Sequence, residues 1–124
     1  MDPYVVIQYK NQKYTSKTAR GQGNKPVWNE EFKFSVEYPT RDQNYELILE
    51  IMDRDTFTHD DYLGQTTIDL KGLFEEGVEK GKADLGSHEK YRVVLTDGTY
   101  NGEIQVGINF TAKVRVLVNL IKYF

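Results

Sequence analysis

Glu103-Ile104-Gln105-Val106-Gly107-Ile108-Asn109-Phe110 places an apolar side chain at every second position from residue 104 to residue 110. Successive side chains of a β-strand point to opposite faces of the sheet, so this period of two puts all four apolar side chains on one face. The stretch therefore predicts a strand with one face in a hydrophobic core and the other face in water.

The same period recurs along the rest of the chain. Turn-forming residues separate the runs, notably Gly21-Gln22-Gly23-Asn24-Lys25-Pro26 and Asp97-Gly98, and only residues 69–80 hint at a helix. Seven or so short strands at intervals of roughly 8–15 residues are typical of an all-β fold, an antiparallel β-sandwich. The further strand runs are at 4–9, 32–36, 46–51, 66–70 and 91–95.

Length and composition narrow the classes of function. With 124 residues the chain is expected to form a single domain, 1–124. The absence of cysteine excludes a disulfide scaffold and a thiol nucleophile, and two histidines leave little room for a histidine-based metal site. Neither His59 nor His88 lies in a recognisable nucleophile motif, so we expect no enzyme.

The net charge of −3 conceals an uneven distribution of charged residues. Between Pro3 and Asn29 there are five cations and no acid, a local charge of +5. Between Asp53 and Asp61 four aspartates stand against one arginine, a local charge of −3. These two segments are the candidates for recognition of a ligand or a surface.

The acidic segment, residues 53–61, lies between two predicted strands. Four carboxylates in nine residues repel one another, and a hard divalent cation such as calcium would relieve that repulsion through oxygen ligands. The EF-hand pattern does not fit, because Thr58 stands where it requires glycine and Gly64 where it requires glutamate. The alternative is a solvated acidic loop without a ligand.

Three motifs in order resemble the C2 domain. They are Asp2-Pro3-Tyr4-Val5, then Pro26-Val27-Trp28-Asn29-Glu30-Glu31-Phe32, and then Asp53-x-Asp55 with Asp61 and Leu63-Gly64. The match covers about residues 2–110, and the stretch 91–110 is most similar to small single-C2 plant proteins of the elicitor-responsive and phloem types. The resemblance implies an eight-stranded Greek-key sandwich with calcium-binding loops at one end.

The resemblance also implies individual site residues. Asp60 is one residue off the family pattern, and Phe57 at the loop tip would insert among lipid headgroups or, alternatively, pack on its own loop. The implied calcium ligands are the carboxylates of Asp2, Asp53, Asp55 and Asp61, a side-chain oxygen of Thr58 and the main-chain carbonyl of Arg54.

A C2 domain of this type would begin with a strand that precedes Asp2-Pro3-Tyr4 and carries one more aspartate of the first loop. The tail, residues 112–124, alternates Val114, Val116, Val118 and Leu120 with other side chains. We expect it to return antiparallel beside residues 103–110 and to take the place of that first strand. Thr111-Ala112-Lys113 is a poor hairpin turn, so a fortuitous apolar extension of a truncated chain is the alternative.

The basic segment follows the first predicted strand. Lys10, Lys13 and Lys17, with Lys33 on a later strand, are similar to the family's lipid-contacting basic face. An ordinary solvated surface is the alternative. RNA binding is a third interpretation, but only Tyr9 and Tyr14 could supply stacking rings beside these lysines.

The expected function is a calcium-dependent phospholipid-binding module in plant defence signalling, with calcium as its cofactor. The alternative is a calcium-independent protein-interaction or RNA-binding scaffold on the same fold. We expect a cytoplasmic monomer that associates reversibly with anionic lipid at the plasma membrane.

Overall fold

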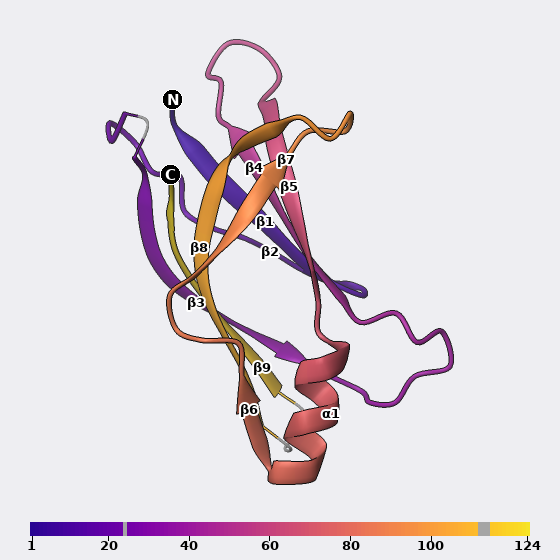
Figure 1. Cartoon of the computed structure of the whole chain (residues 1–124). Coiled ribbons are helices and arrows are strands. Elements are labelled where there is room, and N and C mark those ends of the chain that lie inside the picture. The colour runs from indigo at the N-terminus through magenta and orange to yellow at the C-terminus, as the bar shows by residue number, and fades with distance from the viewer. Residues whose placement is uncertain (24, 112–114) are drawn as a thin grey trace.

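The computed structural model describes residues 1–23, 25–111 and 115–124, and antiparallel strands make up most of them (Figure 1). One helix, α1 (Lys71–Lys80), lies at the end of the molecule opposite residues 54–60. The strands are β1 (Pro3–Tyr9), β2 (Gln12–Thr15), β3 (Val27–Ser35), β4 (Glu46–Asp53), β5 (Asp61–Asp69), β6 (Lys82–Asp84), β7 (Glu89–Val94), β8 (Tyr100–Thr111) and β9 (Arg115–Tyr123).

The strands form two packed layers. Their hydrogen-bonded order is β2-β1-β4-β5-β7-β8-β9-β3, and the short β6 pairs with β8 outside this path. Only Gln65 and Val94 pair across the junction of β5 and β7, so one layer is β2-β1-β4-β5 and the other is β7-β8-β9-β3. Non-consecutive neighbours such as β1–β4 and β3–β9 agree with the predicted all-β antiparallel sandwich of eight strands.

The core lies between the two layers and is built from the alternating residues of the strands. In β8 the side chains of Ile104, Val106, Ile108 and Phe110 are at most 1% exposed, as the period of two predicts. Every second residue of β1 and β4 is buried in the same way from the other layer. The sandwich is therefore held together mainly by burial of apolar area along both inner faces.

The C-terminal tail is a strand inside the second layer. β9 pairs antiparallel with β8, with Ile108 opposite Val118, and antiparallel with β3, with Phe34 opposite Val116. This agrees with the predicted return beside residues 103–110. The predicted turn falls partly on residues 112–114, which lie outside the described residues, and substitution for a family strand stays a prediction.

The other side of the sandwich closes through side chains rather than through a strand ladder. Gln12 of β2 donates from Nε2 to the Ser35 carbonyl (2.6 Å) and accepts from the Ser35 amide at Oε1 (2.8 Å). The Tyr14 ring packs edge-on against Phe34 at a centroid distance of 5.1 Å. The edges of β2 and β3 are thus joined, which leaves fewer free strand-edge groups for pairing with other chains.

α1 ends at Gly81, which adopts the left-handed backbone conformation of a C-cap. Gly81 has φ +87° and follows the last turn as a left-handed C-cap, with its amide bonded to the Gly77 carbonyl. The helix occupies most of the predicted 69–80 segment. No helix in the described part of the chain is long and apolar enough to cross a membrane.

Alanine substitutions at two glycines of α1 should change the free energy of unfolding in opposite directions. A Cβ on Gly77 would lie 2.1 Å from Cδ2 of Phe110, which is 1% exposed, whereas a Cβ on Gly72 meets nothing within 4 Å. Gly77→Ala is therefore expected to lower the free energy of unfolding by about 1–3 kcal/mol through overpacking. Gly72→Ala should raise it by ~0.5–1 kcal/mol through helix propensity, and urea denaturation checks both values.

Candidate functional site

Three neighbouring strands bring aspartates to one end of the first layer. Asp2 precedes β1, Asp53 ends β4 and Asp61 begins β5. In the sheet register Pro3 lies opposite Asp53, and Asp53 lies opposite Asp61. The sequence positions of these residues are far apart, but the topology places all three beside the loop 54–60, at the upper end in Figure 1.

Main-chain and carboxylate groups fasten these segments together. The Asp2 amide donates to Asp53 Oδ1 at 2.8 Å, and the Arg54 amide donates to the Asp2 carbonyl at 3.0 Å. The Gly21 amide donates to Asp2 Oδ1 at 3.3 Å, which ties in the loop between β2 and β3. Asp2 and Asp53 therefore stabilise the local backbone through one carboxylate oxygen each, and their second carboxylate oxygens take no part in these bonds.

Internal donors stabilise the ionised form of two carboxylates in the loop 54–60, those of Asp55 and Asp60. Asp55 Oδ1 accepts from the amides of Phe57 (2.8 Å) and Thr58 (3.2 Å), and these bonds lower the pKa of Asp55. Asp60 accepts from the Tyr4 hydroxyl and, at 2.9 Å, from the Asp55 amide. The bond from Tyr4 is the main cause of the lowered pKa of Asp60.

Asp60 has a structural role at this site that the sequence pattern did not indicate. It is one residue off the family pattern, yet it connects the loop to β1 through Tyr4, 56 positions away in the chain. Arg54 supports the same contact: its guanidinium lies 4.6 Å from the Tyr4 ring centroid and its Nε donates to Thr18 Oγ1 at 2.9 Å. Nothing in the spacing of the aspartates could have indicated this bridge.

The donor set suits calcium in its chemistry, because it consists of carboxylate and carbonyl oxygens near one another and near water. Among the residues that the structure describes, however, no three acidic or histidine side chains converge on one metal position. Asp55 turns one oxygen toward its own loop amides, and both oxygens of Asp60 accept hydrogen bonds. Coordination through Oδ1 of Asp55 would thus compete with these loop amides, whereas its Oδ2 takes no part in these bonds.

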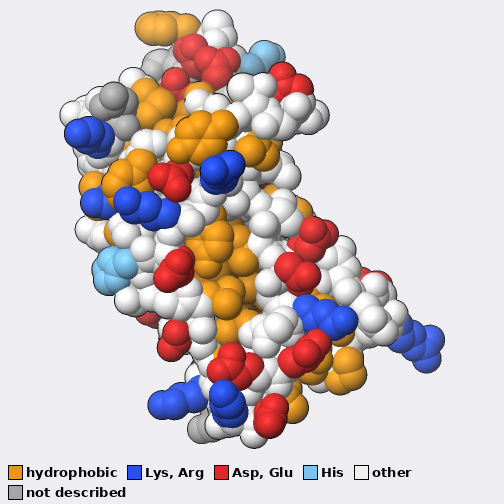
Figure 2. All heavy atoms as spheres, in the orientation of Figure 1, with side chains coloured by type: hydrophobic (Ala, Val, Ile, Leu, Met, Phe, Trp, Pro, Cys, Tyr) orange, Lys and Arg blue, Asp and Glu red, His pale blue; other side chains and the backbone are white. Residues whose placement is uncertain are grey.

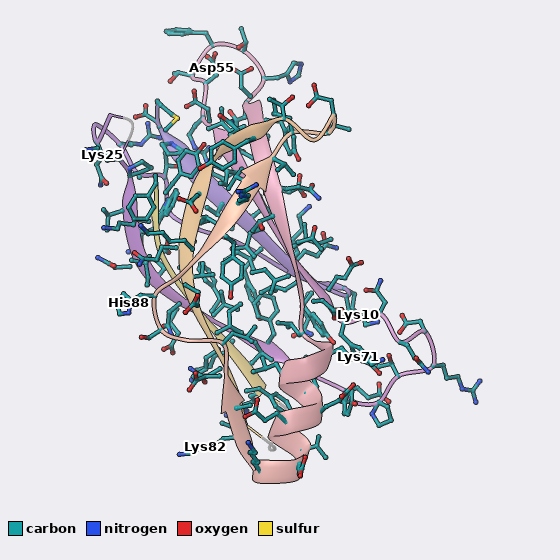
Figure 3. The ribbon with its side chains drawn as sticks, viewed as in Figure 1. Lys10, Lys25, Asp55, Lys71, Lys82 and His88 are labelled. Carbon is teal, nitrogen blue, oxygen red and sulfur yellow. The ribbon has the colours of Figure 1, made fainter. Side chains whose placement is uncertain are left out.

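Phe57 is the most exposed of the large hydrophobic side chains at this end. Its ring is 94% exposed, so it does not pack on its own loop. The two loop amides that bond Asp55 belong to Phe57 and Thr58, and they fix the backbone at the loop tip. The structure therefore holds an aromatic ring out into solvent beside a cluster of carboxylates, with Asp55 labelled in Figure 3.

The predicted lysines do not share one face. Lys10 follows β1 at the end opposite Asp55 (Figure 3), where its Nζ bonds both oxygens of Asp42 at 2.7 and 2.8 Å. These bonds hold the pKa of Asp42 well below its usual range. Lys13 lies on β2 in the first layer, Lys33 lies on β3 in the second, and Lys17 follows β2.

Comparison with known proteins places the chain in a family. The C2 domain model matches residues 1–85. Elicitor-responsive protein 1 of Oryza sativa subsp. japonica is 46% identical over 93% of this chain and 72% of its own length. The 16 kDa phloem protein 1 of Arabidopsis thaliana is 42% identical over 90% of this chain and 71% of its own length.

A solved structure agrees with the sequence comparisons. A C2 domain-containing protein from a putative elicitor-responsive gene superposes with a TM-score of 0.65 at 34% identity, covering 98% of this chain and 74% of that one. The sandwich, the motif order and the aspartates at one end of the sheet point the same way. The chain belongs to the C2 domain family.

Proposed function

We propose that this C2 domain binds anionic phospholipid membranes in a calcium-dependent way through the end that carries Asp2, Asp53, Asp55 and Asp61. C2 domains mediate interactions with lipids or with proteins, and family membership supports a function of that class. The observation that carries the finer proposal is the arrival of three strand ends, each with an aspartate, beside one acidic loop. Thr58 and the Arg54 carbonyl are the further proposed ligands.

The proposed mechanism is electrostatic. The loop segment 53–61 carries −3, so it repels an anionic bilayer while its carboxylates are ionised, and internal donors to Asp55 and Asp60 favour that ionised form. Calcium would supply positive charge and open coordination positions for phosphate oxygens. The exposed ring of Phe57 is placed to enter the headgroup layer once that repulsion is removed.

A calcium-independent interaction scaffold, for a protein or for RNA, is the second candidate. It is favoured by the same hydrogen bonds that close the loop, because both oxygens of Asp60 and one oxygen of Asp55 accept hydrogen bonds without any ion. In that case the acidic end would be a rigid recognition surface. For both candidate functions we propose a non-catalytic, monomeric cytoplasmic protein. For the calcium-dependent function we further propose reversible association with the plasma membrane in plant defence signalling.

Titration of calcium into the lipid-free protein, followed by amide chemical shifts, tests the proposed site. We expect saturable shifts at Asp2 and at residues 53–61, because these amides lie next to the proposed ligands. The amides of Lys71 and Lys82, at the α1 end in Figure 3, are the internal control and should not move. Shifts that are absent, or spread evenly over both ends, would reject calcium binding here.

A further inference from the structure

A cluster of cations and aromatic rings covers part of the second layer, on residues that the predicted basic face does not include. Two ammonium groups lie near the Phe124 ring, with Lys90 Nζ at 4.3 Å and Lys122 Nζ at 4.8 Å from the ring centroid. The Arg92 guanidinium lies 5.7 Å from the Tyr100 ring centroid. We call Lys90, Arg92, Tyr100, Lys122 and Phe124 the cation–aromatic patch.

The register of the strands accounts for this gathering. Lys90 of β7 and Lys122 of β9 both lie opposite Gln105 of β8, and Arg92 lies opposite Glu103. Because the neighbouring Ile104 and Val106 are fully buried, the alternate residues of β8 face outward, and their cross-strand partners share that outer face. Figure 2 shows cationic and hydrophobic side chains interleaved on the half of this face nearer the acidic loop.

The patch lies toward the same end of the molecule as the acidic loop. Tyr100 begins β8, and the side chain of the next residue, Asn101, donates to the Leu63 carbonyl just after the start of β5. The Phe124 amide donates to the Glu103 carbonyl at 2.7 Å, which fixes the last residue beside β8. The rings of Tyr100 and Phe124 are 55% and 42% exposed, so they join Phe57 as exposed aromatic side chains toward this end.

We infer that the cation–aromatic patch is a second membrane contact, one that binds anionic lipid headgroups without calcium. The inference rests on the membrane being the target proposed above. Three cationic side chains stand against the carboxylate of Glu103 and the terminal carboxylate of Phe124, a net charge of +1, and each cation near an anionic bilayer adds about 1 kcal/mol. Aromatic rings with one polar edge or a cationic neighbour are suited to the headgroup region.

The geometry favours lipid over single-stranded nucleic acid. Base stacking needs open ring faces, but two ammonium groups lie over the Phe124 ring and a guanidinium lies over the Tyr100 ring. Glu103 also lies within the patch and would interrupt a continuous track for a phosphate backbone. Separate headgroups in a bilayer can avoid that carboxylate, because each lipid moves independently.

Two matched double variants of the full chain test the inference. Lys90→Gln/Lys122→Gln removes two charges from the patch, and Lys71→Gln/Lys82→Gln removes two from the α1 end (Figure 3). Binding is measured by cosedimentation with phosphatidylserine–phosphatidylcholine vesicles, with calcium and with a chelator. We expect the patch variant to bind about tenfold or more weakly than wild type in both conditions and the control variant to stay near wild type.

Each outcome separates the two proposals. Chelator-resistant binding that only the patch variant loses supports the inference, even if calcium adds nothing. Strong calcium-dependent binding that is equal in the two variants would overturn the inference and leave the proposed function intact. Equal loss of vesicle binding in both variants would show an effect of net charge only and would overturn the inference. Binding of each variant to a single-stranded RNA oligonucleotide is measured as well. If the patch variant lost RNA binding while its vesicle binding stayed unchanged, the patch would be assigned to RNA, which would also overturn the inference.

Discussion

Deletion of residues 112–124 is expected to abolish the cooperative unfolding transition of the domain. β9 lies between β3 and β8, so its loss would uncover the paired edges of both strands. It would also remove four side chains that are at most 7% exposed, namely Val116, Val118, Leu120 and Tyr123. At ~1.5–3 kcal/mol for each, this equals most of the ~5–15 kcal/mol by which domains are stable.

Circular dichroism during heating measures the effect, and single substitutions separate packing from chain length. Val118→Thr places a hydroxyl in the core and should lower the free energy of unfolding by about 1–3 kcal/mol. Leu117→Thr changes a neighbouring side chain on the outer face and should cost about 1 kcal/mol or less. An unchanged melting temperature for the deletion would mean that the sandwich is stable without β9.

Asp53→Asn/Asp55→Asn is expected to remove calcium-dependent vesicle binding at calcium concentrations that saturate wild type. Each change replaces an anionic ligand by a neutral amide, and the number of charged ligands sets calcium affinity over several orders of magnitude. We expect the calcium requirement to rise on the order of 100-fold. Asparagine keeps an acceptor oxygen for the amides of Asp2, Phe57 and Thr58, so the fold should be preserved.

The matched control is Asp69→Asn/Asp84→Asn, which makes the same change in net charge near α1. Asp69 and Asp84 also accept main-chain amides, from Lys71 and Gly86, so the two double variants are similar in structural role. Thermal unfolding confirms that both remain folded. If both double variants raised the calcium requirement equally, total charge rather than the Asp53–Asp55 segment would govern the response.

The strands that the sequence predicts well are those with one buried and one wet face. Residues 103–110 and 115–122 alternate because β8 and β9 each pack one face into the core. β2 shows no such alternation because Gln12–Thr15 is almost wholly polar, and its position depends on pairing with β1 and on the Gln12–Ser35 bonds. β6 has three residues, too few to show a period.

The candidate site also contains residues that the sequence predicts and contacts that it does not. The aspartates could be proposed from motif order, because family resemblance carries residue positions. The Tyr4–Asp60 bond could not, because it joins residues 56 positions apart and depends on how β1 lies beside β4. The cation–aromatic patch likewise assembles from three strands, and the positions of its charged residues in the sequence do not show that they meet. Of the predicted lysines, Lys33 falls on the second layer, and Lys10 lies at the far end of β1, paired with Asp42.

Cosedimentation of the wild-type protein with phosphatidylserine–phosphatidylcholine vesicles, in calcium and in chelator, tests the central claim most directly. We expect calcium to increase the pelleted fraction several-fold over the chelator value, since the −3 segment 53–61 otherwise repels the anionic surface. Vesicles of phosphatidylcholine alone should pellet little protein in either condition. Equal pelleting with calcium and with chelator, or none in both, would contradict a calcium-controlled membrane module.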